Sequence, residues 1–391
     1  MHPNREEEPS EGIGDFAMKT LILKSLDACN LRCDYCSVGD KTASGMMTEP
    51  DMQRAMSFFA EQVQADGEGQ IIFHGGEPTL LPAAQYDRCI RQLRRDFPAL
   101  RFRLSMQTNG VLLTEEYLAL FRTHDIHIGV SLDGGRAIHD GQRKDAAGNG
   151  SYERVMENIR SLQENDIPVA ALMVVTRPAL EAGLDFLDLL DEMDVPLKIN
   201  PLLALGEAPR HPELALAPGD YSRYLIRVFE YAAEKDLSLH LSPLSELMAA
   251  ILGNTRPAGC VYSPRCCRDF LCIDREGVIY PCGRFSDTHT HTLGTVESGI
   301  TAEGEEILRR LEARRTAPVP EPCRDCRWLS MCHAGCSADH PEETSPCAIC
   351  EDQKQLFQYL RTCGLKIMKS QLLKERARLL QLLKKGDGNE L

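Results

Sequence analysis

Short apolar runs alternate with amphipathic segments along the first half of the chain, from about residue 19 to residue 200. This alternation is typical of βα units, in which a buried strand precedes a helix and successive strands form a parallel sheet. We therefore expect six strands in this part of the chain. They cover residues 20–26, 71–74, 102–108, 126–133, 169–176 and 197–201.

Several of the intervening helices carry recognisable start signals. Thr48 followed by Asp51 resembles a capping box, in which each side chain bonds to the other residue's backbone N–H. We expect Thr114 and Ser151 to be the N-caps of two further helices. An apolar stripe at helical spacing follows the capping box. It consists of Met52, Met56, Phe59 and Val63.

Six βα units are too few to close an eight-stranded barrel, so the pattern predicts an α/β fold with a partial (β/α)6 barrel. Sheets of this kind bind ligands at the carboxyl ends of their strands. A proline-containing segment at 205–220 interrupts the pattern, and helices are expected at residues 221–235 and 244–252.

We divide the chain into five segments on these grounds. A flexible tail precedes the barrel core, and a linker with helices, a cysteine-rich domain and C-terminal helices follow it. The bounds are 1–17, 18–205, 206–256, 257–356 and 357–391.

Charge and hydropathy exclude two classes of function. The 44 Lys and Arg residues against 58 Asp and Glu residues give a formal net charge of -14, which argues against a nucleic-acid backbone binder. No apolar run reaches the roughly 18 residues of a membrane span, and the first residues are acidic and polar. We therefore expect a cytoplasmic protein without nucleic-acid or membrane partners.

The 16 cysteines indicate metal binding, because a chain without a secretion signal should not depend on disulfides. Cys29, Cys33 and Cys36 follow the first predicted strand with the spacing C-x3-C-x2-C. Three thiolates in one short loop can hold three irons of a 4Fe-4S cluster and leave the fourth iron open. A structural zinc site is disfavoured, because it would need a fourth Cys or His nearby.

This loop, with Tyr35 just before the third cysteine, resembles that of the radical S-adenosylmethionine (SAM) enzymes. The resemblance implies that SAM binds the open iron and that Tyr35 lies beside the adenine. It continues in Gly75, Gly76, Glu77 and Pro78, which match the family's GGEP motif after the second strand. In the family this motif contacts the methionyl amino group through its backbone and its Glu.

Polar residues alternate at the ends of the third and fourth predicted strands. Alternation places Ser105, Gln107 and Asn109 on one strand face, and Ser131 and Asp133 on one face of the next strand. The resemblance implies that these positions contact the ribose and carboxylate of SAM. Arg143 is a candidate partner of the SAM carboxylate through bidentate pairing.

The second half of the chain resembles a SPASM domain, whose pattern is C-x9-15-G-x4-C followed by C-x2-C-x5-C-x3-C and a last cysteine. The resemblance implies two auxiliary 4Fe-4S clusters in a small domain after a TIM-like radical SAM barrel. We assign the first cluster to Cys266, Cys272, Cys282 and Cys336. We assign the second to Cys323, Cys326, Cys332 and Cys350. Cys267 is an alternative to Cys266, and Cys347 is an alternative to Cys350.

The resemblance implies the reaction class. A reduced cluster cleaves SAM to a 5'-deoxyadenosyl radical, which removes hydrogen from a substrate carbon. Two SPASM groups are similar to this chain, the maturases of ribosomally made peptides and the anaerobic sulfatase-maturating enzymes. In the latter an Asp follows the third ligand of the first auxiliary cluster, whereas this chain has Gly283.

The missing carboxylate favours a peptide maturase that makes an oxidative cross-link of the cyclophane or thioether type in a precursor peptide. A sulfatase-maturating enzyme and a SPASM enzyme acting on a small molecule are the alternatives. A non-catalytic iron-sulfur protein is disfavoured, because it needs neither the open-iron loop nor GGEP. No catalytic acid or base is identified from the sequence.

The expected partners are the precursor peptide and a flavodoxin- or ferredoxin-type reductant. Only about 18 residues precede the barrel, so leader-peptide recognition is expected from another protein, the barrel surface or the C-terminal helices. Those helices combine basic residues with leucines, which suits either a docking site or packing on their own domain. The residues are Lys366, Lys369, Leu372, Leu373, Lys374, Arg376, Arg378, Leu379, Leu380, Leu383, Lys384 and Lys385.

Overall fold

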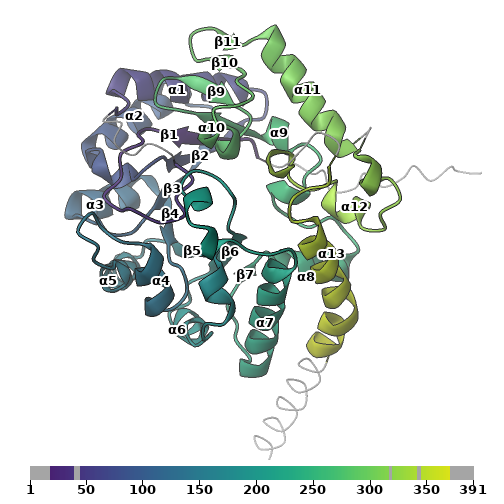
Figure 1. Ribbon diagram of the computed structural model, residues 1–391. Helices are drawn as coiled ribbons and strands as arrows, with labels where there is room; N and C mark the ends of the chain where they lie inside the picture. Colours follow the sequence, from purple (N-terminus) through teal and green to yellow (C-terminus); the bar gives the residue numbers. More distant parts are fainter. Residues whose placement is uncertain (1–17, 39–44, 317–318, 341–344, 370–391) are drawn as a thin grey trace, which may run out of the picture.

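One mixed sheet of eleven strands organises the described part of the protein (Figure 1). The computed structural model describes residues 18–38, 45–316, 319–340 and 345–369. The strand order is β11-β10-β9-β8-β1-β2-β3-β4-β5-β6-β7. Strands β8 and β1 to β7 run parallel, whereas β9, β10 and β11 continue the sheet in antiparallel fashion.

The first six strands confirm the predicted α/β fold and its partial barrel. They are β1 (Thr20–Lys24), β2 (Glu68–His74), β3 (Arg101–Thr108), β4 (Ile126–Ser131), β5 (Val169–Val175) and β6 (Leu197–Pro201). The helices between them are α1 (Glu49–Gln62), α2 (Ala83–Asp96), α3 (Glu115–His124), α4 (Arg136–Gln142), α5 (Tyr152–Glu164) and α6 (Phe186–Glu192). Each predicted strand overlaps an observed one, and most differ from it only by a few terminal residues.

Alternation along these strands separates a packed face from an inner, concave face. Leu21 and Leu23 of β1 are fully buried, as are Ile71 and Phe73 of β2, and they belong to the core beneath the helices. Lys24 lies opposite His74 in the register of β1 and β2, on the other face of the sheet. The inner face therefore carries polar side chains at the carboxyl ends of the strands.

The predicted capping box is confirmed at α1. The backbone N–H of Thr48 donates to Asp51 Oδ2 at 3.3 Å, and the backbone N–H of Asp51 donates to Thr48 Oγ1 at 3.3 Å. Thr114 and Ser151 occupy the N-cap positions of α3 and α5, but neither side chain caps its helix. Ser151 Oγ instead donates to the carbonyl of Arg143 at 3.0 Å, since the backbone of Ser151, with ψ -1, is not in the extended conformation of a capping residue.

The second half of the chain extends the same sheet. It contains α7 (Asp220–Lys235), β7 (Leu241–Ser242), α8 (Leu244–Gly253), α9 (Cys266–Asp269), β8 (Phe270–Ile273), β9 (Val278–Tyr280), α10 (Gly283–Asp287), β10 (Gly294–Thr295) and β11 (Gly299–Ile300). The last helices are α11 (Ala302–Thr316), α12 (Leu329–Cys332) and α13 (Cys350–Tyr359). Because β8 pairs with β1, the cysteine-rich region begins beside the first barrel strand.

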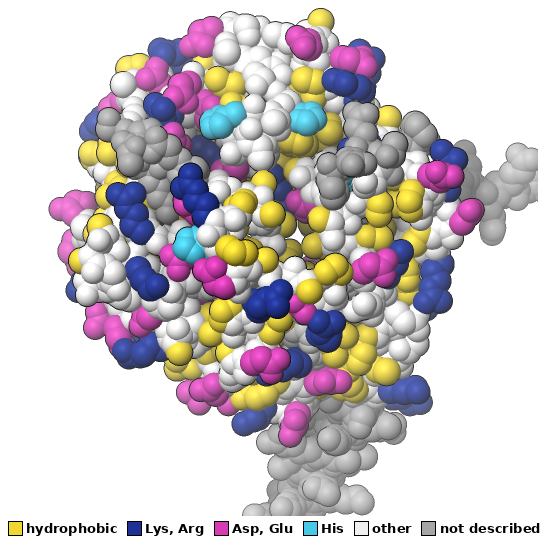
Figure 2. Space-filling view, viewed as in Figure 1, with side chains coloured by type: hydrophobic (Ala, Val, Ile, Leu, Met, Phe, Trp, Pro, Cys, Tyr) yellow, Lys and Arg dark blue, Asp and Glu magenta, His cyan; other side chains and the backbone are white. Residues whose placement is uncertain are grey.

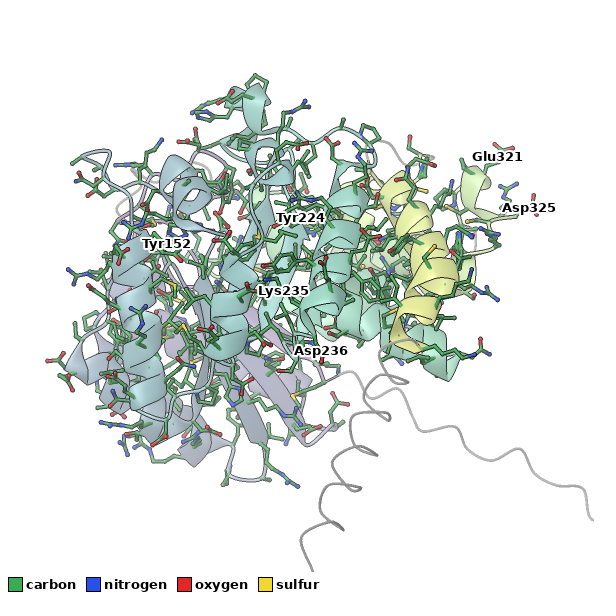
Figure 3. All side chains as sticks on the ribbon, turned by 90° about the horizontal axis from the view of Figure 1, so that it is seen from below. Tyr152, Tyr224, Lys235, Asp236, Glu321 and Asp325 are labelled. Carbon is green, nitrogen blue, oxygen red and sulfur yellow. The ribbon has the colours of Figure 1, made fainter. Side chains whose placement is uncertain are left out.

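The cysteine-rich region also shares the apolar core of the barrel. Leu271, Trp328 and Phe357 belong to the same buried cluster as Leu21 and Phe73. Seen from below, Glu321 and Asp325 lie at the opposite end of the molecule from Tyr152 of α5 (Figure 3). Glu321 and Asp325 of the cysteine-rich region therefore lie at one end of the molecule, whereas its strand β8 lies beside β1. The boundary of the region at residue 257 stays a prediction.

Two expectations lie partly or wholly outside the described residues. The predicted tail, 1–17, and the C-terminal residues from 370 onwards fall there. Within the described ranges, no helix is both long enough and apolar enough to span a membrane.

Candidate active site

The loop that carries Cys29, Cys33 and Cys36 is fixed at both ends by backbone hydrogen bonds. The N–H groups of Gly76 and Glu77 donate to the carbonyls of Leu26 and Ala28 at 2.7 and 2.9 Å, where the loop leaves β1. Further on, Arg32 and Asp34 donate to the carbonyls of Lys144 and Gln142 at 2.6 and 3.1 Å. The three thiols are thus presented from a constrained loop at the carboxyl end of β1.

Gly75 and Gly76 are required by the close approach of this loop. Gly75 has φ +131, and a Cβ built on it would lie 2.3 Å from the carbonyl oxygen of Leu26. A Cβ on Gly76 would lie 2.1 Å from the carbonyl oxygen of Ala28. The two glycines of the GGEP motif therefore let the second strand's loop lie against the cysteine loop.

Glu77 is fully buried and binds protein donors. Its Oε1 accepts from Thr79 N, Thr79 Oγ1 and Thr108 Oγ1 at 3.0, 2.7 and 2.6 Å, and its Oε2 accepts from Asn109 N at 2.7 Å. Burial raises the pKa of Glu77, although these hydrogen bonds oppose the shift. The carboxylate joins the ends of β2 and β3, where its predicted contact with the SAM amino group would have to compete with these donors.

The predicted polar residues of β3 and β4 share the inner face of the sheet. Ser105 lies opposite Ile72 in the β2–β3 register, and Gln107 Nε2 donates to Ser131 Oγ at 3.3 Å across β3 and β4. Asn109 follows at the strand end, with its Nδ2 3.7 Å from Cys29 Sγ. Asn109 thus contacts the cysteine loop, whereas Gln107 and Ser131 contact each other further along the same face.

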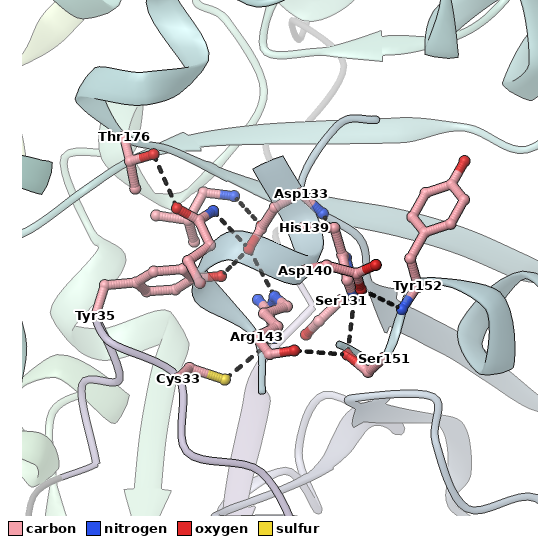
Figure 4. Close-up of polar contacts among 12 residues, drawn as sticks. Cys33, Tyr35, Ser131, Asp133, His139, Asp140, Arg143, Ser151, Tyr152 and Thr176 are labelled. Carbon is pink, nitrogen blue, oxygen red and sulfur yellow. Dashed lines mark hydrogen bonds and ion pairs between the residues drawn. The ribbon is translucent and has the colours of Figure 1, made fainter. Parts of the chain in front are cut away.

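Asp133 lies at the centre of a buried polar network (Figure 4). Its Oδ2 accepts from Tyr35 Oη, from Gln142 Nε2 at 3.0 Å and from Arg143 Nε at 2.6 Å. Its Oδ1 accepts from the backbone N–H of Val174 at 2.9 Å. Burial raises the pKa of Asp133, but Arg143 and these donors outweigh it and leave the pKa below its ordinary value.

Asp133 and Arg143 bind each other in this structure, and their contact with SAM stays a prediction. Asp133 is fully buried because its carboxylate holds Tyr35 and Arg143 together. The Arg143 guanidinium lies 5.3 Å from the centre of the Tyr35 ring, and its Nη1 lies 3.9 Å from Cys33 Sγ. This geometry makes both residues supports of the cysteine loop.

The segment predicted as a linker covers the cysteine loop. The backbone N–H of Glu207 donates to the carbonyl of Cys36 at 2.9 Å. Gly206 has φ +57, and a Cβ on it would lie 2.2 Å from the same carbonyl oxygen. Tyr35 packs beneath this segment against Ala208 and Leu214. The sequence analysis did not predict this contact, for which Gly206 among the prolines was an unused signal.

A cavity of about 380 Å³ separates the cysteine loop from the cysteine-rich region. Tyr35 and Ser37 line one side, and Arg284 and Phe285 of α10 line the other. Figure 2 shows the face on which hydrophobic side chains surround a hollow. Five cysteines also line the cavity. They are Cys260, Cys266, Cys267, Cys282 and Cys336.

A charged pair lies in this cavity that the sequence did not reveal. Lys24 Nζ lies 2.5 Å from Asp287 Oδ1 and donates to the carbonyl of Gly283 at 3.0 Å, with side chains of Lys24 and Asp287 only 6% and 12% exposed. Burial lowers the pKa of Lys24, but the Cys272 thiol and Asp287 outweigh it and raise the pKa overall. His74 lines the same cavity, and burial followed by Lys24 lowers its pKa to about 4.

The first predicted cysteine group is only partly reproduced in space. Cys266, Cys282 and Cys336 line the cavity, whereas Cys272 is fully buried in β8, where Ser286 of α10 bonds to its thiol. Cys260, which the assignment left out, and Cys267, its alternative to Cys266, also line the cavity, and the Sγ atoms of Cys266 and Cys267 are 3.8 Å apart. The cavity thus lacks Cys272 of the predicted set and adds Cys260 and Cys267.

The second predicted group does come together. Cys323, Cys326, Cys332 and Cys350 line one small pocket, together with Cys347. Burial, opposed by the N–H of Ala334 and assisted by the thiols of Cys326, Cys323 and Cys350, raises the pKa of Cys332 to about 11. The Cys347 thiol differs in its surroundings. Burial and Asp339 raise its pKa to about 11, and N–H groups of Ile349 and Cys336 bond to it.

These thiols suit iron-sulfur clusters better than disulfides. All 16 cysteines are free, and the charged form of each thiol would be the natural ligand of iron. At Cys282, burial raises the pKa to about 11, while the N–H groups of Phe285 and Arg284 at the start of α10 oppose the shift by bonding to the sulfur. Such N–H donors stabilise a metal-bound thiolate.

Residues 23–190 match the radical SAM superfamily. Together with the cysteine loop, the GGEP turn and the partial barrel, this match identifies residues 23–190 as a radical SAM domain and the chain as an enzyme. A 4Fe-4S cluster and SAM are the cofactors of this superfamily, as expected from the sequence.

Among the proteins to which the chain is similar are anaerobic sulfatase-maturating enzymes. It is 27% identical over 366 residues to the cysteine-type enzyme of Clostridium novyi, covering 88% of this chain and 95% of that one. It is 23% identical over 391 residues to the serine-type enzyme of Bacteroides thetaiotaomicron, covering 92% and 93%.

Solved structures share the fold. Native anSMEcpe with bound AdoMet and the Cp18Cys peptide superposes with a TM-score of 0.76 at 23% identity, covering 90% of this chain and 98% of that one. Streptococcus suis SuiB bound to S-adenosylmethionine superposes with a TM-score of 0.60 at 15% identity, covering 85% and 75%. The SPASM-like arrangement of the cysteine-rich end agrees with these matches.

Proposed function

We propose that this enzyme oxidises a side chain of a peptide or protein held in the cavity between the cysteine loop and the first cysteine group. The observation that carries the proposal is the cavity itself, which is lined by Tyr35, by Cys282 and by the Lys24–Asp287 pair. A substrate side chain there would lie between the site of radical formation and a group able to take up an electron.

Cys29, Cys33 and Cys36 would hold the 4Fe-4S cluster to which SAM binds. With SAM, this cluster supplies a carbon radical that removes a hydrogen atom from the substrate. Residues of the GGEP turn and of the inner sheet face would bind SAM, and Asp133 and Arg143 would keep the loop in place. The SAM-binding set is Tyr35, Gly75, Gly76, Glu77, Pro78, Ser105, Gln107, Asn109 and Ser131.

The two other cysteine groups would hold auxiliary clusters. The second cluster would be held by Cys323, Cys326, Cys332 and Cys350. These thiols lie close enough together that their neighbours raise the pKa of Cys332 and of Cys323. For the first cluster, cavity lining favours Cys260, Cys282 and Cys336 with either Cys266 or Cys267. In this assignment Cys260 replaces Cys272.

Asp287 supplies a carboxylate close to Gly283, the position at which the sulfatase-maturating enzymes have an Asp. The two residues are one helical turn apart on α10, so their side-chain positions lie on the same face. A Cβ on Gly283 would lie 3.8 Å from Lys24 Cε, and the Asp287 carboxylate already contacts Lys24 Nζ. Asp287 is therefore placed to accept the proton of a substrate thiol or hydroxyl, which supports oxidation of a Cys or Ser side chain.

Cross-linking of a precursor peptide, of the cyclophane or thioether type, is the second candidate. The observation that favours it is Gly283, which leaves space on the cavity wall for a second substrate side chain. Peptides are bound by native anSMEcpe and by SuiB, with its precursor peptide SuiA, which supports a peptide substrate in either case. A flavodoxin- or ferredoxin-type protein would supply the electron that starts the reaction.

Iron analysis of the anaerobically reconstituted protein tests the cofactor assignment. Three 4Fe-4S clusters require about twelve irons per chain. Changing Cys29, Cys33 and Cys36 together to Ala should leave about eight irons and abolish SAM cleavage. About four irons in the unchanged protein would contradict the two auxiliary clusters.

Product analysis separates the two candidate reactions. The enzyme would be incubated anaerobically with SAM, reductant and peptides taken from sulfatases and short open reading frames near its gene. An aldehyde that reacts with a hydrazide supports side-chain oxidation. Loss of two hydrogens without an aldehyde, together with a linked fragment in mass spectra, supports cross-linking. Absence of any modified peptide alongside efficient SAM cleavage would count against a peptide substrate.

A further inference from the structure

Arg284 lies where the cavity meets the first cysteine group. It is the second residue of α10, and its Nη1 donates to Cys336 Sγ at 3.2 Å. The same nitrogen forms an ion pair with Asp339, whose side chain is 5% exposed. Arg284 itself is 28% exposed and lines the cavity. One guanidinium thus contacts a sulfur, a buried carboxylate and the cavity.

Arg284 and Asp339 have opposite electrostatic effects on a cluster held by Cys336. A hydrogen bond to a ligating sulfur and a nearby positive charge favour the reduced cluster, which carries one more negative charge. A buried carboxylate close to the same sulfur favours the oxidised cluster, because like charges repel. The planar guanidinium lets Arg284 contact both groups in a fixed geometry.

We propose that Arg284 is a positioning residue that raises the reduction potential of the cluster held by Cys336, and that Asp339 limits this effect. The proposal rests on the proposed function, because it requires an auxiliary cluster at this group. Its consequence is that the cluster nearest the substrate accepts an electron more readily than it would without Arg284. Because Arg284 lines the cavity, the positive charge that raises the reduction potential lies beside the substrate.

A redox titration followed by EPR tests the proposal on the reconstituted full chain without substrate. Arg284→Gln should move the midpoint potential of one cluster to a lower value at unchanged iron content. Arg284→Lys keeps the positive charge but loses the planar guanidinium that contacts both Cys336 and Asp339. Its midpoint potential should therefore move in the same direction as that of Arg284→Gln, by a smaller amount. Asp339→Asn removes the opposing carboxylate and should move the same midpoint to a higher value.

Arg268→Gln is the matched control. Arg268 pairs with Glu305 and Glu312 of α11, so its loss removes an arginine from the same region without touching Cys336. The control should leave all midpoints unchanged.

Two results would overturn the proposal. One is an unchanged set of midpoints in Arg284→Gln with full iron content, and the other is a downward shift in Asp339→Asn. If Arg284→Gln loses iron, the proposal is tested by the direction in which the midpoint potential moves in Arg284→Lys and in Asp339→Asn. Failure of the proposed function is recognised separately, since a wild-type protein with about four irons has no auxiliary cluster to titrate.

Discussion

The hydroxyl of Tyr35 donates to the carboxylate of Asp133, which lies 98 positions further along the chain. This bond joins the cysteine loop after β1 to the carboxyl end of β4, and Arg143 completes the arrangement from the end of α4. The loop that would hold the catalytic cluster is thereby fixed by an internal ion pair.

Asp133→Asn should destabilise the protein strongly. The change leaves Arg143 buried without its counter-charge, and breaking a buried pair from one side costs about 3–5 kcal/mol. Chemical denaturation under anaerobic conditions would measure the loss in the free energy of unfolding. Asp125→Asn is the control, because that side chain is 87% exposed. Equal effects of the two changes would contradict the role given to Asp133.

Adding Arg143→Gln to Asp133→Asn should restore part of the lost stability. The double variant contains no unpaired buried charge, so the two effects should be less than additive. Simple additivity would show that the ion pair is not what couples the two positions.

Stability should decrease below neutral pH because of His139. Its Nδ1 accepts from the Asp133 N–H at 3.2 Å and its Nε2 contacts Ser151 Oγ at 2.9 Å, and burial lowers its pKa from 6.5 to about 4. Between these values only the unfolded chain binds the proton, so the free energy of unfolding rises with pH. At pH 5.5 this one group costs about 1 kcal/mol relative to pH 7.5.

His139→Gln should therefore reduce the difference in unfolding free energy between pH 7.5 and pH 5.5 by about 1 kcal/mol. His127→Gln provides the comparison, because the His127 side chain is 64% exposed. If His127→Gln flattened the pH dependence as much as His139→Gln does, burial of His139 would not be its cause.

Iron content should distinguish Cys260 from Cys272. Cys260→Ala removes a ligand from the cavity set, so we expect the loss of about four irons per chain. Cys272→Ala should keep the full iron content, because that thiol is buried against Ser286. Iron and sulfide assays on matched preparations measure both. The reverse pattern would restore the ligand set predicted from the sequence.

Asp287→Asn should slow product formation without preventing SAM cleavage. Loss of a general base reduces rates by about 10²–10⁴-fold, whereas SAM cleavage takes place at the cysteine loop. Single-turnover assays would follow modified peptide and 5'-deoxyadenosine separately. Introducing Gly283→Asp into this variant should recover part of the rate, because a side chain there would contact Lys24. A parallel decrease of both products would indicate a structural effect instead.

The sequence predicted well those features that depend on local periodicity. Burial alternates along β2 and β3, so the strands could be located from apolar positions, and the GGEP turn follows β2 as expected. The cysteine spacings indicated iron-sulfur chemistry, which the radical SAM match supports for the loop after β1.

Contacts between distant residues could not be predicted in the same way. Lys24 and Asp287 are 263 positions apart, and nothing near either residue indicates the other. The resemblance implies that Glu77 and Asp133 contact SAM, and it did not reveal that protein donors bind both carboxylates. Cys272 matched the spacing of a ligand, but α10 covers it in the fold. Whether a side chain contacts a ligand or other protein groups depends on which helices and strands pack against it.

The pairing of β8 with β1 determines whether the barrel can be expressed without the cysteine-rich region. Without the residues after 256, β1 would become an edge strand with the sequence TLILK and unpaired backbone groups. Exposed apolar edges of this kind promote aggregation. A barrel expressed alone should therefore precipitate, and the barrel and the cysteine-rich region should unfold as one unit.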